Sequence, residues 1–270
     1  MRTTSNPAFR NLPTQGGYAT FDRQGGMMGG GAAYADAQAS RAGYGRAGAG
    51  ERALTHDDVV IKTAITFGAA LVAGILTAWS GLYGLALPAI LVGFVISLVI
   101  IFRQSTNPAL VLLYSVAEGV ALGALTGFLE FSNTNFQGIG FQAIVGTAGV
   151  FVGMLIVYKT GAVKVTPKFT KWLIGAGIGV VVLMLVNMLV GLFTTGGLGL
   201  RDGSPLAYVF SIVCIGVAAF SLMLDFDMAD RAVKEGAPAR FAWYIAFGLM
   251  TTLVWLYIEI LRLLSYLRSE

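Results

Sequence analysis

Five acidic side chains lie inside or at the end of strongly apolar stretches, where a charged group is costly. They are Glu118, the cluster of Asp225, Asp227 and Asp230, and Glu259. Glu118 comes about ten residues into its stretch, which is roughly 15 Å along a helix and near the middle of a bilayer. A carboxyl group at that depth must face neighbouring helices or a wet cavity, and its charge can change near working pH. The pattern favours an ion or proton path over a purely structural hydrogen bond.

The other acids carry weaker signals. The spacing of Asp225, Asp227 and Asp230 places them on different faces of one helix end, so at least one of them should face inward. For Asp225 and Asp230 we favour a solvated helix end. Glu259 stands one helical turn before Arg262, so an ion pair between the two is as well supported as a role in an ion path.

Long membrane-spanning helices must hold these acids. Hydrophobic residues make up 56% of the chain and charged residues 12%, whereas soluble domains carry about 25% charged residues. Apolar stretches of about 20 residues, each long enough to cross a bilayer, recur along the chain. The sequence therefore predicts an all-α membrane protein, a seven-helix bundle with these spans: Val59–Trp79, Leu82–Phe102, Ala109–Glu130, Ile139–Tyr158, Trp172–Phe193, Pro205–Leu224 and Phe241–Leu264.

Glycines repeat every four residues in two of the predicted spans. The third span has Gly119, Gly123 and Gly127, and the fourth has Gly149 and Gly153. Small residues at this spacing let a neighbouring helix approach closely. Both repeats therefore predict helix packing, and neither indicates catalysis.

The predicted membrane domain, residues 55–268, follows a Gly- and Ala-rich segment, residues 1–54, whose composition predicts a disordered tail. Basic residues gather in this tail and after the second, fourth and sixth spans, whereas the opposite side carries only Arg201. Such a bias predicts a cytoplasmic N-terminus. With seven spans the C-terminus lies outside, whereas a re-entrant last span, the alternative suggested by Arg262 and Arg268 near that end, would not place it there. We expect a multi-pass protein of a bacterial plasma membrane.

Several classes of function lack support in the sequence. The net charge of +4 comes from basic residues in loops and does not indicate nucleic-acid binding. There is one cysteine, Cys214, one histidine, His56, and no CxxC or HExxH pattern, so metal hydrolase and thiol chemistry are not indicated. Without a nucleophile–base pair or a phosphate-binding loop, we expect neither an enzyme nor a cofactor, and no certain metal site.

Three motifs resemble those of one family of small multi-span membrane proteins. The third span reads YSVAEGVALG from Tyr114 to Gly123, the sixth ends in FDMAD, and the last contains AFGLMTTLVWLYIEILRLLS. Over residues 55–268 the chain resembles the Bax inhibitor/YccA-like family, also called transmembrane Bax inhibitor motif proteins. Each motif is weak alone, but together with the seven-span layout they are fairly specific.

The resemblance implies a bundle in which six helices surround the last one, and a pH-sensitive calcium leak in which two aspartates on the last two helices form a pair. Asp227 matches the first aspartate. A register without gaps puts Thr252 at the second position, whereas an alternative register puts Glu259 there. In the leading hypothesis, calcium or protons pass along Glu118, Asp227 and Thr252 or Glu259, and the neighbours of the gate are Asp225, Asp230 and Arg262.

The alternative hypothesis is a non-conducting regulator. Some members of the family bind a membrane-anchored protease or other membrane partners, which would make the acids structural and the tail the contact surface. In either hypothesis the lipid bilayer is the surrounding partner, and calcium is the transported ion of the first.

Overall fold

The structure, a computed structural model, describes residues 47–48, 50–194 and 197–269. These residues contain seven helices that are long and apolar enough to cross a membrane, and they correspond one to one with the predicted spans. The largest difference is at the end of α7, which continues ten residues beyond the predicted end at Leu224 and so carries the aspartate cluster inside the helix. The helices are α2 (His56–Ser80), α3 (Ala86–Arg103), α4 (Pro108–Ser132), α5 (Ile139–Thr160), α6 (Pro167–Gly191), α7 (Pro205–Lys234) and α8 (Ala242–Ser269).

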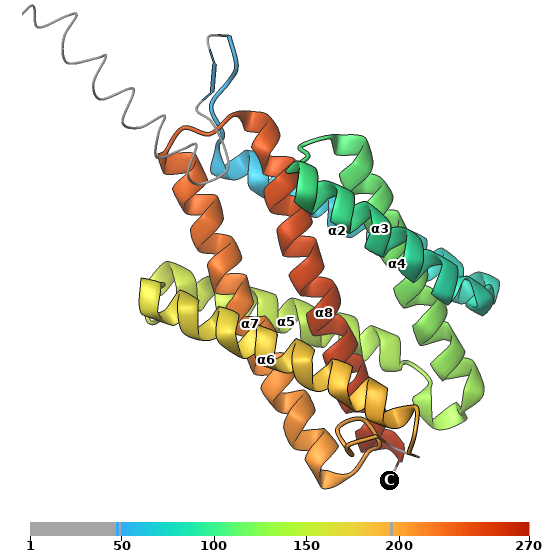
Figure 1. Cartoon of the computed structure of the whole chain (residues 1–270). Coiled ribbons are helices and arrows are strands. Elements are labelled where there is room, and N and C mark those ends of the chain that lie inside the picture. Colours follow the sequence, from blue (N-terminus) through green and yellow to red (C-terminus); the bar gives the residue numbers. More distant parts are fainter. Residues whose placement is uncertain (1–46, 49, 195–196, 270) are drawn as a thin grey trace, which may run out of the picture.

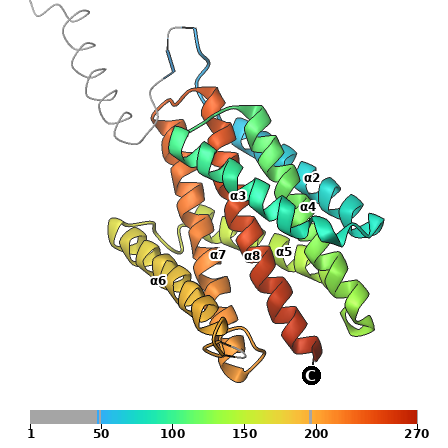
Figure 2. The same ribbon diagram turned by 45° about the vertical axis from the view of Figure 1, so that its right-hand side comes forward.

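The last helix is central, as the resemblance implied. Helix α8 packs against α2, α4, α5 and α7, while α3 packs mainly against α4 and α6 mainly against α7. Figure 1 and Figure 2 both show α8, in red, between α7 and the group formed by α2, α3 and α4. The α8 segment is the most buried of the seven. A polar side chain on α8 therefore faces other helices more often than lipid.

Short polar residues define where several helices begin. The hydroxyl of Thr55 accepts a hydrogen bond from the backbone N–H of Asp58, and the Asp58 carboxylate accepts one from the N–H of Thr55. This reciprocal capping box satisfies N–H groups that have no partner within the helix. Proline follows the capping residue at the start of α4, α6 and α7, where its missing N–H costs little.

The glycine repeat of α4 makes the tightest helix contact. A methyl group added at Gly119 or Gly123 would collide with the backbone of Ala70 or Gly74 in α2. The third glycine, Gly127, lies against the ring of Tyr83. The predicted packing role of this repeat is confirmed, and it lets the backbones of α2 and α4 come into direct contact.

The second glycine repeat does not pack in this way. An added methyl group at Gly149 or Gly153 of α5 would meet no atom within 4 Å. The prediction of close helix packing there is wrong, because the spacing makes a smooth helix face but cannot supply a neighbour for it.

The residues just before α2 are attached to the connection between α7 and α8. The N–H of Leu54 donates to the carbonyl of Ala237 at 2.8 Å, and the N–H of Ala239 donates to the carbonyl of Arg52 at 2.9 Å. The ammonium group of Lys62 adds a bond of 2.7 Å to the Ala239 carbonyl. Residues 1–46 of the predicted disordered tail lie outside the described residues, whereas its last residues are held in place by these bonds.

Candidate functional site

A carboxyl group and a hydroxyl group meet across the contact between α7 and α8. The Thr252 hydroxyl donates a hydrogen bond of 2.7 Å to Oδ2 of Asp225, and it also lies 3.3 Å from the carbonyl oxygen of Gly248, one turn earlier on α8. Both side chains are partly buried. Because α8 is central, this contact lies inside the bundle, and the expectation that Asp225 belongs to a solvated helix end is wrong.

The other two aspartates of the cluster face away from Thr252. Asp227 forms an ion pair with Arg231 at 2.7 Å, one turn further along the same helix. Asp230 pairs with Lys234 and lies 3.8 Å from the imidazole of His56. The structure therefore brings Thr252 to Asp225 and not to Asp227, the aspartate matched to the family pair. Two residues along a helix correspond to a rotation of about 200°, so the two side chains point to opposite sides.

The carboxyl group of Glu118 lies between α4 and α3. A methyl group added at Gly93 of α3 would come within 2.9 Å of its Oε1 atom, so a glycine is what makes room for this acid. One turn earlier on α4, Tyr114 interacts with Glu118 and shares a hydrogen bond of 3.1 Å with the hydroxyl of Thr251. Thr251 precedes Thr252 on α8. The structure thus places polar side chains on two sides of α8 at one level, but it does not bring Glu118 itself to Asp225.

Glu259 closes the other end of the contact between α7 and α8. Its carboxylate is only 1% exposed and accepts two hydrogen bonds of 2.9 Å from Arg201 and one of 3.2 Å from Arg262. Arg201 comes from the connection between α6 and α7, and its guanidinium group lies 5.1 Å from the ring centre of Phe210. The pair with Arg262 was one of two interpretations that the sequence left open, whereas the bidentate pair with Arg201 was not expected. One feature of the sequence could have indicated this pair: Arg201 is the only basic residue in the loops on the side of the membrane opposite the N-terminus.

The residue after Arg201, Asp202, is hydrogen-bonded to the residue that caps α7. Asp202 accepts a hydrogen bond of 2.9 Å from the N–H of Ser204, the residue that caps the helix. This bond holds the pKa of Asp202 below its usual value, because it favours the charged carboxylate. The turn that presents Arg201 to Glu259 is therefore fixed by its own local hydrogen bonds.

Thr252 and Glu259 belong to one face of α8, because seven residues make about two turns. We call this face, together with the α7 side chains opposite it, the α7–α8 seam. Between the levels of Asp225 and Glu259, α7 and α8 contribute apolar side chains to one shared cluster, among them Leu222, Leu253 and Leu256. The structure therefore shows a seam with polar groups at two levels and an apolar closure between them.

Comparison with known proteins identifies the family of this chain. A family model described as Bax inhibitor 1 like matches residues 6–269. The chain belongs to the Bax inhibitor 1-like family. The match confirms the resemblance carried by the three sequence motifs and extends it into the segment before residue 55. A comparison with curated proteins gave no match.

Membership in the Bax inhibitor 1-like family gives the α7–α8 seam its context. The resemblance implied a pair of aspartates on the last two helices, with Asp227 as the first, whereas the structure places Asp225 against Thr252. The register without gaps stays a prediction: it names Thr252, which contacts Asp225 and not Asp227. The alternative register, which also stays a prediction, names Glu259, and this side chain pairs with Arg201 and Arg262 at the far end of the seam.

The described residues contain no group of three or more His, Cys, Asp or Glu side chains that could hold a metal ion. A calcium ion prefers six to eight oxygen ligands. One carboxylate and one hydroxyl at the Asp225–Thr252 contact are too few to hold such an ion on their own.

Proposed function

We propose that this membrane protein is a pH-sensitive cation leak, with calcium or protons passing along the α7–α8 seam. The observation that carries the proposal is the hydrogen bond between Asp225 and Thr252. Ionisable side chains inside a membrane are expensive and usually mark ion or proton pathways. Here the acid lies on the central helix contact and has only a neutral hydroxyl as its hydrogen-bond partner in that contact.

In the structure described above, the α7–α8 seam is closed to ions. Apolar side chains of α7 and α8 separate the two polar levels of the seam, and in this proposal they exclude water and ions from the segment between them. The Glu259 cluster ties the connection before α7 to α8 at one end. Passage of a cation requires α7 and α8 to separate between these levels, and both ties resist that separation.

The charge of Asp225 couples the seam to pH. When the carboxyl group is ionised it accepts the Thr252 hydroxyl in a charge-assisted hydrogen bond, which is roughly twice as strong as a neutral one. Protonation replaces this bond by a weaker one and removes a negative charge from the interior. Opening of the seam and its attraction for cations therefore both depend on the protonation of one side chain.

Membrane orientation belongs to the same proposal. The excess of Lys and Arg in the loops on the N-terminal side supports a cytoplasmic N-terminus in a bacterial plasma membrane. The Asp227, Asp230 and Arg231 side chains then lie at the cytoplasmic end of the seam, and the Glu259 cluster lies at its outer end. The regulator hypothesis depended on the tail, of which residues 1–46 are outside the described part, and the described residues offer nothing that favours it.

Flux measurements in proteoliposomes test the proposal. We expect wild type to conduct calcium or protons at a rate that changes with pH, and Asp225→Asn, which cannot titrate, to conduct at a rate that no longer does. Asp227→Asn is the matched control, because it removes a nearby aspartate whose partner is the partly exposed Arg231. Equal pH dependence in all three proteins would refute the assignment to Asp225, and no flux in wild type would refute the leak.

A further inference from the structure

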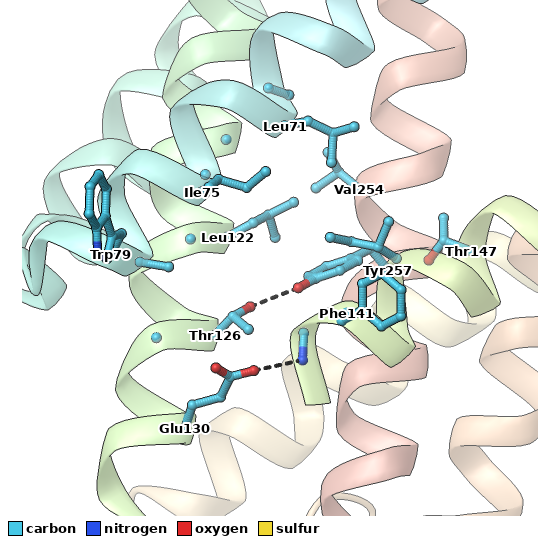
Figure 3. Close-up of a pocket in the computed structure, with 18 of the residues that line it drawn as sticks. Leu71, Ile75, Trp79, Leu122, Thr126, Glu130, Phe141, Thr147, Val254 and Tyr257 are labelled. Atoms are coloured by element: carbon cyan, nitrogen blue, oxygen red, sulfur yellow. Dashed lines mark hydrogen bonds between the residues drawn. The ribbon is translucent and has the colours of Figure 1, made fainter. Parts of the chain in front are cut away.

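A large cavity opens on the side of the bundle between α2 and α5. Its volume is about 870 Å³. Figure 3 shows α2 and α4 on one side and α5 and α8 on the other, with Leu71, Ile75, Leu122, Phe141 and Val254 pointing into the space between them. Ile75 and Phe141 are more than half exposed, so the cavity opens sideways. In a membrane, that opening faces lipid tails.

The length of the cavity fits one leaflet of a bilayer. Along α2 it is lined from Phe67 to Trp79, which corresponds to about 18 Å at 1.5 Å per residue. Half of a hydrocarbon core of about 30 Å is roughly 15 Å. An acyl chain of a lipid in that leaflet therefore matches the cavity in length and polarity.

Polar groups gather toward the end of the cavity at the C-terminal ends of α2 and α4. The Thr126 and Tyr257 hydroxyls share a hydrogen bond of 2.8 Å across it, and Oε1 of Glu130 accepts one of 3.0 Å from the N–H of Gly140. No basic side chain of the described residues forms an ion pair with Glu130. Trp79 also lines this end, and tryptophan is enriched where a bilayer meets water. The cavity thus has an apolar body and a polar mouth with an acid.

A basic side chain is bonded to the loop that contributes Gln137 to this mouth. Nη1 of Arg268 donates to the carbonyl of Gln137 at 2.8 Å and to that of Asn135 at 3.1 Å. Gln137 lines the cavity and precedes Gly140, the partner of Glu130, by three residues. Residues 137–140 are therefore hydrogen-bonded both to an acid, Glu130, and to a guanidinium group, that of Arg268. This arrangement of charges complements a headgroup that carries both an ammonium and a phosphate.

We propose that this cavity binds one amine-bearing zwitterionic phospholipid, with an acyl chain between α2 and α5, the ammonium group at Glu130 and the phosphate at Arg268. The site does not depend on the proposed leak, because it lies on the opposite side of α8 from the α7–α8 seam. Phosphatidylethanolamine is the natural probe. Phosphatidylglycerol, which has a phosphate but no amine, is the matched control lipid.

Contact quenching of tryptophan fluorescence tests the proposal on the full chain in detergent. The lipids carry brominated acyl chains, which quench a tryptophan that they touch. One variant keeps only Trp79, at the cavity, and a second keeps only Trp172, which lies exposed on α6; the remaining tryptophans are replaced by phenylalanine. We expect phosphatidylethanolamine to quench Trp79 in a saturable manner at one lipid per chain, and to quench Trp172 without saturation.

The Glu130→Gln variant of the Trp79-only protein tests the headgroup contact. A single accessible ion pair contributes up to about 1 kcal/mol, or about a fivefold change in affinity. We expect phosphatidylethanolamine to bind about fivefold more weakly to Glu130→Gln, and phosphatidylglycerol to bind equally to both proteins. An unchanged melting temperature checks the fold, since glutamine retains an oxygen for the Gly140 N–H. Equal binding of the two lipids to the unmodified Glu130 protein, or the same non-saturating quenching at Trp79 and Trp172, would overturn the proposal.

Discussion

Replacing Arg201 with methionine removes the bidentate partner of a carboxylate that is almost completely buried. Glu259 is 1% exposed, and the two bonds from Arg201 are both 2.9 Å long. Breaking a buried ion pair by removing one partner destabilises a protein by about 3–5 kcal/mol. The remaining bond from Arg262, at 3.2 Å, keeps Glu259 from being left alone. We therefore expect Arg201→Met to lower the free energy of unfolding by about 3 kcal/mol, at the low end of that range.

Two further variants distinguish two causes of the lost stability: the buried charge of Glu259 left without its partner, and the loss of contacts made by the Arg201 side chain. Arg201→Lys keeps the charge but cannot form the two-pronged bond, so its loss should be intermediate. The double variant Arg201→Met with Glu259→Met removes the buried charge together with its partner and should recover to within about 1 kcal/mol of wild type. The free energy of unfolding is measured by circular dichroism in mixed micelles with increasing dodecyl sulfate. If Arg201→Met is as stable as wild type, or if the double variant is no better than the single one, the inferred role of this pair is wrong.

Two other predictions concern the packing of α4 and the start of α7. Gly123→Ala places a methyl group against the backbone of Gly74. Because the helices must then move apart, we expect the free energy of unfolding to fall by about 2 kcal/mol. Gly149→Ala, whose added methyl group meets no atom within 4 Å, is the control in the same unfolding assay. Asp202→Asn removes a carboxylate whose pKa is held below its usual value by the Ser204 N–H. A group with a depressed folded pKa stabilises above its unfolded pKa and loses this contribution as pH falls, so the melting temperatures of wild type and Asp202→Asn should differ at pH 7 and converge at acidic pH. A constant difference would contradict this assignment.

The seven helices were predictable because hydropathy and length report the cost of leaving polar backbone groups in lipid, and only a helix of that length satisfies them. The capping at Thr55 was predictable because it depends on residues close in sequence, and the small-residue face of α4 was predictable from the spacing of its glycines. The two glycine repeats also show the limit of such patterns. A pattern describes one face of a helix, whereas a contact requires a second helix that the pattern does not specify.

The choice between Asp225 and Asp227 shows this limit at the site itself. Which aspartate faces α8 depends on the rotation of α7, and that rotation is set by the packing of its whole buried face. A signal was present: Ser211, Ala218, Asp225 and Ala232 recur every seven residues, and the three small ones are fully buried. Asp227 falls outside this repeat. Arg201 could not be assigned to Glu259 from spacing, because the two are 58 residues apart.

The most direct test of the proposed pathway asks whether ions pass position 252. A Thr252→Cys variant is made in a Cys214→Ala background, which removes the one native cysteine. A water-soluble cationic thiol reagent is then applied at a pH where flux is high. We predict that the reagent reaches position 252 under these conditions and that its attachment stops the flux. Flux that continues unchanged after complete modification, or flux through a protein whose position 252 is never modified, would contradict passage along the α7–α8 seam.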